Sequence, residues 1–298
     1  MEQKQFEDQI RIRAKEIEQR IYRFLPEEEG YQRTVLCAMN YTMQAGGKRI
    51  RPMLMEMTYQ MFGMHSDAID AFMAAIEMIH TYSLIHDDLP ALDNDDYRRG
   101  RPTAHKQYGE DMAILAGDGL LNYAFEVASG AFEGHLGDER IAKALMILAK
   151  KPGIYGMIGG QTADVELTGK TLDEDQLAFI YENKTGALIE AAMMIGAVLG
   201  GANDAETEQV CEAASKIGLA FQIQDDILDV EGEAMKLGKP VGSDEKNDKT
   251  TYVTIHGIEQ AKQKVLDYSA QAQSIMQSMG RPCDELLSLI QWMIYREV

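Results

Sequence analysis

Apolar residues along this chain recur at intervals of three and four positions, and strict alternation is scarce. Ile10, Ala14, Ile17 and Ile21 show the spacing, which predicts helices with one buried face. The periodic segments run over residues 2–24, 31–45, 52–63, 67–88, 111–134, 138–150, 153–168, 173–200, 204–231, 257–280 and 283–297. No segment has the Val, Ile and Thr content between turns that strands need. We therefore predict a single all-α domain, residues 1–298, of about eleven helices.

Local signals support these boundaries. Asp138-Glu139 opens one helix, and Thr171 to Glu174 resembles a capped first turn. The most apolar run, residues 186–202, contains Glu190 and is short and rich in glycine, so we interpret it as a core helix. No linker is long enough to divide the chain into domains.

Composition and charge narrow the class of protein. Hydrophobic residues make up 45% and charged residues 26%, which is typical of a soluble globular protein with a large core. The net charge of −19 argues against a nucleic-acid partner, which needs a basic surface. Cys37, Cys211 and Cys283 lie far apart and predict free thiols in a reducing cytoplasm. The polar start of the chain does not resemble a signal peptide, and we expect no integral membrane segment.

Two aspartate-rich segments each follow a long apolar run. Their carboxylates are Asp87, Asp88 and Asp93 in the first segment, and Asp225, Asp226 and Asp229 in the second. Carboxylates are rarely buried unless they are paired or bound to metal, and like charges this close resist joint ionisation. The two clusters therefore predict sites for divalent cations. Carboxylate oxygens suit Mg²⁺, which usually binds substrate phosphates as well, and Mn²⁺ is a possible substitute.

The geometry of each cluster follows from its helix. Asp225 and Asp229 are four residues apart and share one helix face. In the first cluster Pro90 disfavours helical geometry at the residue before it, so we expect that helix to end near Asp88. Asp93 then reaches back from the loop.

Basic residues near these clusters predict binding of an anion. Arg98 and Arg99 follow the first cluster, and guanidinium groups beside such carboxylates match a diphosphate. A solvated surface loop with cancelling charges is the alternative. Lys48 and Arg51 flank a turn before a helix that starts near Pro52, which is a natural anion site although basic helix ends are common.

Two further elements have uncertain roles from sequence alone. Lys184-Thr185-Gly186 interrupts an apolar helix, and taken alone this pattern favours a lysine that extends its charged end to the surface over a site residue. The segment Gly159-Gly160-Gln161-Thr162-Ala163-Asp164 is compatible with a helix-packing contact or with a site.

Together these motifs resemble those of the trans-isoprenyl diphosphate synthases, most closely the bacterial farnesyl diphosphate synthases. The matching segments are residues 47–52 (GKRIRP), 83–93 (SLIHDDLPALD), 98–100 (RRG), 184–186 (KTG) and 221–229 (FQIQDDILD). The resemblance implies a helical bundle around a deep central cavity, usually a homodimer, with the two Asp motifs facing each other across the cavity mouth. It also implies Mg²⁺-assisted condensation of isopentenyl diphosphate with dimethylallyl or geranyl diphosphate.

The resemblance implies a role for each motif residue. Asp87, Asp93 and Asp225 would bind Mg²⁺, about three ions per site, with support from Asp88, Asp164, Asp226 and Asp229. Arg98, Lys184, Lys239 and Lys249 would bind the allylic diphosphate, and Lys48, Arg51, His80 and Arg99 would bind isopentenyl diphosphate. Thr185 and Gln222 would face the allylic cation, so that Lys184, Thr185 and Gln222 form the catalytic set.

Chain length is predicted from the residues before the first Asp motif. Tyr82 lies five residues before Asp87 and Ser83 lies four before it. An aromatic residue at the fifth position, with two extra residues inside the motif, resembles the bacterial C15 synthases, whereas C20 remains the alternative. The segment from residue 238 to 249 reads as a lid or an ordinary surface loop. Only Arg296 is available to replace the basic tail of many relatives.

Rival functions explain fewer of these features. A metal-dependent phosphohydrolase would use His86-Asp87 but leaves the second Asp cluster unexplained. A terpene cyclase generally lacks an isopentenyl diphosphate pocket, whereas Lys48 and Arg51 are present here. A non-catalytic prenyltransferase subunit loses the aspartates, and this chain keeps both sets.

Overall fold

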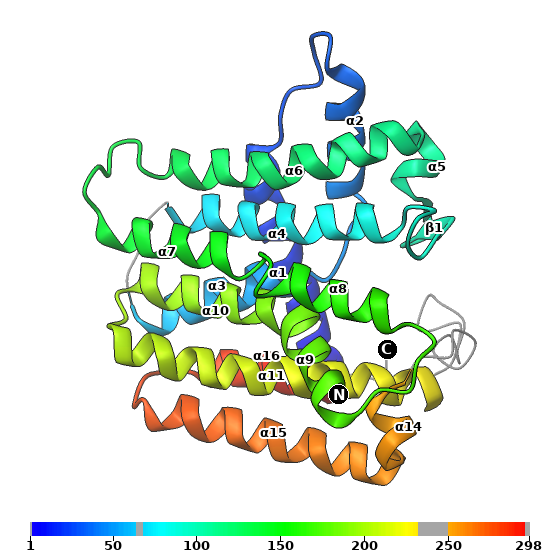
Figure 1. The fold of residues 1–298 in the computed structure, drawn as a ribbon. Helices are drawn as coiled ribbons and strands as arrows, with labels where there is room; N and C mark the ends of the chain where they lie inside the picture. The colour runs from blue at the N-terminus through cyan, green and yellow to red at the C-terminus, as the bar shows by residue number, and fades with distance from the viewer. Residues whose placement is uncertain (1, 64–67, 232–249, 296–298) are drawn as a thin grey trace. The chain divides into compact units, whose positions relative to one another are not determined.

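The structure is a computed structural model that describes residues 2–63, 68–231 and 250–295, apart from the side chains of residues 2–5 and 295. Its larger helices are α1 (Glu2–Ile21), α2 (Arg33–Met43), α3 (Ile50–Met61), α4 (Ala68–Asp87), α6 (Glu110–Gly130), α7 (Glu139–Lys150), α8 (Met157–Leu167), α10 (Ala187–Gly200), α11 (Asp204–Glu231), α15 (Ile258–Ser278) and α16 (Asp284–Tyr295). The shorter elements are η1 (Tyr22–Phe24), α5 (Ala104–Tyr108), α9 (Glu174–Ile180), η2 (Tyr181–Gly186) and α14 (Tyr252–His256). The all-α class predicted from the sequence is confirmed (Figure 1).

The chain folds into two compact units. The first contains residues 1–56 and 65–145, and the second contains residues 57–64 and 146–298. The prediction of one domain over the whole chain stays a prediction.

Helix α4 is the core of the first unit. It packs against α6 and α1 (Figure 1). Residues from Phe72 to Ile79 are almost wholly excluded from solvent. A helix that is apolar on every side must be surrounded by other elements. By length and composition α4 could also cross a membrane, but 78% of its most apolar window is buried inside the structure, as expected of a core helix.

A short hairpin follows α4, and the sequence did not predict it. Strands β1 (Tyr97–Arg98) and β2 (Arg101–Pro102) pair antiparallel through the two-residue loop Arg99-Gly100. Both loop residues have positive φ, 54° at Arg99 and 75° at Gly100, as a type I′ turn requires. Two residues per strand leave no alternation to detect in the sequence.

In the second unit α11 packs between α10 and α15, and the wide-turn segment η2 packs against α8 and α11. Two glycines permit this close approach. A Cβ added to Gly160 of α8 would lie 2.2 Å from the amide nitrogen of Lys184, and one added to Gly218 of α11 would lie 2.9 Å from the Cα of Gly186. The helix predicted over residues 173–200 is therefore three elements, α9, η2 and α10, and η2 is a π-helix.

Candidate active site

The first Asp motif lies where α4 ends. The helix ends at Asp87, as Pro90 predicted, and the amide of Asp93 donates to the carbonyl of Asp87 at 2.9 Å. This bond returns the loop to the helix end, so Asp93 lies close in space to Asp87. Asp88 is buried, with 3% of its surface exposed, whereas Asp87 is half-buried and Asp93 is exposed.

Asp88 is held by the hairpin. Arg98 Nε donates to its two carboxylate oxygens at 2.8 and 3.0 Å, and an Nη nitrogen donates at 2.6 Å. Burial raises the pKa of Asp88, while Arg98 opposes that shift. Arg98 thus joins the hairpin to the end of α4 and keeps its guanidinium beside the aspartates.

Three cationic or basic groups of the first unit gather with little neutralisation. Burial lowers the pKa of Arg51 to about 10, with a further contribution from Arg99. Its Nε is buried without a hydrogen-bond partner in the described part of the chain. Burial, and then the nearby arginines led by Arg51 and Arg99, hold the pKa of His80 well below 6.5. The two arginine cations beside this neutral imidazole are stabilised by binding an anion.

The second unit contains a cavity of about 110 Å³ that brings several predicted residues together. Its lining includes Asp164, Lys184, Thr185, Gln222 and Asp226. Lys184 Nζ donates to Asp164 at 2.6 Å, and Thr185 Oγ1 donates to Gln222 Oε1 at 2.8 Å. The lysine therefore points toward a carboxylate inside the cavity wall. The Gly160 segment supplies both a packing contact, through the glycine, and a site residue, through Asp164.

Asp226 in the second motif is fixed by neighbours distant in sequence. Tyr181 Oη donates to its carboxylate at 2.5 Å, and the amide of Tyr252 donates at 3.0 Å. Asp226 is 4% exposed and Asp229 is 3% exposed, whereas Asp225 is half-buried. The hydrogen bonds join η2, α11 and the start of α14 at one carboxylate.

The two motifs thus divide their adjacent aspartates in the same way. Asp88 and Asp226 are buried and bound by protein donors, whereas Asp87 and Asp225 are more exposed. Consecutive helical residues point about 100° apart, so one carboxylate turns inward and the next outward. Among the described residues, no group of three or more acidic, His or Cys side chains is arranged to hold a metal. Mg²⁺ commonly binds one or two carboxylates and completes its coordination with substrate phosphates and water, so the donor chemistry fits.

Comparison with known proteins agrees with this arrangement. A sequence model of the polyprenyl synthetase family matches residues 32–281. The chain belongs to the polyprenyl synthetase family. It is 49% identical to a farnesyl diphosphate synthase of Geobacillus stearothermophilus over 241 residues, which are 79% of this chain and 80% of that protein. It is 44% identical over 262 residues to a chloroplastic geranylgeranyl pyrophosphate synthase of Capsicum annuum, covering 87% of this chain and 71% of that one.

Solved structures of the family share the fold. The apo structure of an FPP/GFPP synthase from Zymomonas mobilis superposes with a TM-score of 0.84 at 33% identity, covering 96% of this chain and 99% of that chain. The resemblance to prenyl synthases inferred from the motifs is confirmed.

The residues predicted to set product length in this polyprenyl synthetase lie in the core helix. Tyr82 is 6% exposed, its hydroxyl has no hydrogen-bond partner among the described residues, and burial raises its pKa to about 12. Its ring meets that of His86 edge-on, with centroids 5.8 Å apart. Ser83 Oγ donates to the carbonyl of His80 at 2.9 Å. The role of Tyr82 and Ser83 in chain length stays a prediction.

Other predicted residues lie outside the described part of the chain. Lys239, Lys249 and Arg296 belong to this group. The roles given to the remaining site residues also stay predictions, although their positions are now known.

Sequence reasoning missed several residues of this polyprenyl synthetase site. Tyr181 carried no motif signal, because its partner Asp226 is 45 positions away. Lys170, Thr250 and Thr251 also line the cavity of the second unit, and they come from loops or helix caps without periodicity. Arg49 lies between Lys48 and Arg51, which were both predicted to bind an anion, and the sequence predicted no role for it. No pattern in the run distinguishes the buried cation from its neighbours.

Proposed function

We propose that this chain condenses isopentenyl diphosphate with dimethylallyl and geranyl diphosphates to form (2E,6E)-farnesyl diphosphate. The observation that carries the proposal is the presence of two separate sets of diphosphate-binding candidates. Arg51, His80 and Arg99 gather in the first unit with little neutralisation. Lys184 and Thr185 line a cavity in the second. A reaction between two diphosphates requires both sets.

The first set suits isopentenyl diphosphate, with Lys48 as a further ligand. Arg51 and Arg99 form no ion pair with a carboxylate in the described ranges, so a diphosphate would supply the missing negative charge. His80 is neutral at pH 7 because its pKa is depressed, and the single N–H of its ring can donate a hydrogen bond to a phosphate oxygen.

The second set suits ionisation of the allylic substrate. Lys184, with Arg98, Lys239 and Lys249, would bind the allylic diphosphate as its C–O bond breaks. The proton of Thr185 Oγ1 is directed to Gln222, which leaves the oxygen lone pairs of both side chains available to the allylic cation. The isopentenyl double bond then attacks that cation and the resulting cation loses a proton, for which the released diphosphate is the acceptor. None of the motif residues is required as a nucleophile.

Asp87, Asp93 and Asp225 would hold Mg²⁺, or Mn²⁺ in its place. The metal would neutralise the departing diphosphate. Asp88, Asp164, Asp226 and Asp229 would orient those ligands and their waters. Support comes from the unequal burial of each pair, since Asp88 and Asp226 turn inward onto protein donors whereas Asp87 and Asp225 are half-buried.

We also propose a homodimer in the cytoplasm. Ile114 and Leu115 on α6 are 46% and 50% exposed, which is a substantial apolar surface for one helix to leave in water. The three free cysteines agree with a reducing compartment. Light scattering coupled to size-exclusion chromatography tests the dimer, and a mass of one chain would contradict it.

The activity is tested with radiolabelled isopentenyl diphosphate and each allylic primer in Mg²⁺ buffer. Products are dephosphorylated and chromatographed. A main C15 product is expected, a main C20 product would favour the geranylgeranyl alternative shared with the Capsicum annuum relative, and no condensation would refute a catalytic prenyltransferase. Turnover that survives exhaustive chelation would refute the metal requirement.

A matched pair of variants locates the metal ligands. Asp87→Ala should lower the rate by orders of magnitude while the helical circular dichroism is unchanged. Asp8→Ala removes an aspartate of α1 whose side chain is 56% exposed, and it should leave the rate unchanged. Equal rates for the two variants would remove Asp87 from the site.

A further inference from the structure

The loop between α2 and α3 has an unusual backbone. Gly46, Gly47 and Arg49 have φ values of 85°, 142° and 51°. Arg49 is therefore a side-chain-bearing residue in the left-handed region, which is disfavoured and persists only when surrounding contacts enforce it. The same loop carries Lys48 and leads into Arg51, two of the proposed ligands of isopentenyl diphosphate.

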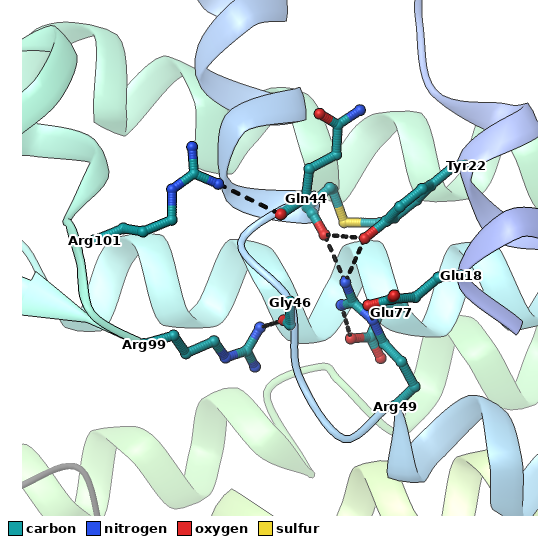
Figure 2. A network of polar contacts seen from close by, with 9 residues as sticks. Glu18, Tyr22, Gln44, Gly46, Arg49, Glu77, Arg99 and Arg101 are labelled. Carbon is teal, nitrogen blue, oxygen red and sulfur yellow. Dashed lines mark hydrogen bonds and ion pairs between the residues drawn. The ribbon is translucent and has the colours of Figure 1, made fainter. Parts of the chain in front are cut away.

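The side chain of Arg49 supplies those contacts from beneath the loop. Its guanidinium donates to Glu18 at 2.9 Å and to Glu77 at 2.6 Å, as Figure 2 shows. It also donates to the hydroxyl of Tyr22 at 2.9 Å and to the carbonyl of Met43, the last residue of α2, at 2.8 Å. Arg49 is 2% exposed, and four groups from α1, η1, α2 and α4 converge on it.

The hairpin holds the same loop from the other side. Arg99 donates to the carbonyl of Gly46, and Arg101 donates to the carbonyl of Gln44 at 3.4 Å (Figure 2). A Cβ added to Gly47 would lie 2.9 Å from the Arg99 guanidinium carbon, so the end of the Arg99 side chain would have to shift. Carbonyl oxygens just after a helix end are natural acceptors for cations.

Arg49 and Arg51 differ in how far nearby carboxylates neutralise their charge. Burial alone would lower the pKa of Arg49, but Glu77, Tyr22 and Glu18 outweigh burial and raise it above its ordinary value. For Arg51 the attraction of Glu77 only partly offsets burial, and its pKa falls to about 10. A guanidinium that is neutralised by two carboxylates has little electrostatic attraction left for a phosphate, whereas Arg51 keeps its own.

We propose that Arg49 is a positioning residue for the isopentenyl diphosphate site. Its bridge to Glu18 and Glu77 holds the left-handed turn that presents Lys48 and Arg51, and it does not touch the substrate. This inference rests on the proposed function.

Arg49→Met tests the proposal, with Arg13→Met as the matched control. Arg13, in α1, likewise forms a partly buried ion pair, with Glu56 at 3.0 Å. We expect Arg49→Met to raise the KM for isopentenyl diphosphate at least about tenfold, equivalent to one lost charge-assisted contact. The KM for geranyl diphosphate should change less than about threefold. Arg13→Met should alter the melting temperature and neither KM.

A second measurement separates this proposal from the activity itself. Isopentenyl diphosphate without Mg²⁺ should raise the melting temperatures of wild type and of Arg13→Met equally, and should raise that of Arg49→Met clearly less at the same concentration. If wild type binds the diphosphate but condenses nothing, the proposed function fails while the positioning role survives. If Arg49→Met does not fold, Glu18→Gln replaces it, because Glu18 is partly exposed and its loss leaves Glu77 in place. Equal changes in both KM values, or an unaltered KM for isopentenyl diphosphate, would overturn the role of Arg49.

Discussion

Replacing Arg51 should stabilise the protein while it impairs substrate binding. The Arg51 guanidinium is buried, its Nε has no hydrogen-bond partner among the described residues, and the Arg99 cation is nearby. Folding therefore destabilises the charged form of Arg51. The fall of its pKa from an ordinary 12.5 to about 10 corresponds to an upper limit of about 3.5 kcal/mol, at about 1.4 kcal/mol for each tenfold change in proton affinity. Because the side chain keeps some contact with water, a gain of about 1–2 kcal/mol is expected for Arg51→Met. That gain corresponds to a rise of about 2–6 °C in melting temperature.

The same change removes one or two charge-assisted hydrogen bonds to the diphosphate. Each contributes about 1.5–3 kcal/mol, so the KM for isopentenyl diphosphate should rise by about 10-fold to 150-fold. Isopentenyl diphosphate should narrow or reverse the difference in stability, since ligand at about one hundred times the wild-type Kd adds about 2.7 kcal/mol to the wild type and about 0.3–1.4 kcal/mol to the variant.

Differential scanning fluorimetry with and without isopentenyl diphosphate, together with steady-state kinetics, measures both effects. Arg11→Met is the control, because the Arg11 side chain is 69% exposed in α1 and should change neither quantity. A lower melting temperature for Arg51→Met in the absence of ligand would show that Arg51 supports the fold. An unchanged KM for isopentenyl diphosphate would place the diphosphate elsewhere.

Three further changes test other features. Below pH 6.5 His80 is protonated in the unfolded chain but not in the folded chain, so the free energy of unfolding decreases as the pH is lowered. Between pH 7.5 and 5.5, His80→Gln should lose about 1 kcal/mol less of this free energy than the wild type. An equal loss of melting temperature in the two proteins would contradict this. Tyr82→Ala should extend the product past C15, as judged by chromatography with excess isopentenyl diphosphate, and an unchanged C15 product would assign chain length to another residue. Gly160→Ala should lower stability by about 1–3 kcal/mol, because the new methyl meets the Lys184 backbone, and should raise the KM of the allylic substrate; Gly130→Ala, where the space is open, should do neither.

Periodicity predicted the helices well because each buries a continuous apolar face. The helix predicted over residues 204–231 has these bounds in the structure, and the end of α4 follows from Pro90. The hairpin at residues 97–102 and the π-helix at Tyr181–Gly186 were missed, since both are set by local backbone geometry that leaves no periodic trace.

For the candidate site, residue type predicted which groups carry chemistry and not which neighbours hold them. Asp226 is bound by Tyr181, which is 45 positions away in the sequence. Arg49 binds Glu18, Glu77 and Met43, which are 31, 28 and 6 positions away. Such pairings depend on how helices pack, and a single sequence does not contain that information.

The π-helical turn at Tyr181–Gly186 amounts to one residue inserted into an otherwise continuous helix. Deleting a residue there would restore regular α-helical hydrogen bonding between α9 and α10. It would also rotate one side of the helix by about 100° against the other, so that Tyr181 and Thr185 could not both keep their present partners. A shorter and more regular helix is therefore one deletion away from this chain. The extra residue therefore allows the side chains before it and those after it to point in directions that a regular α-helix could not combine.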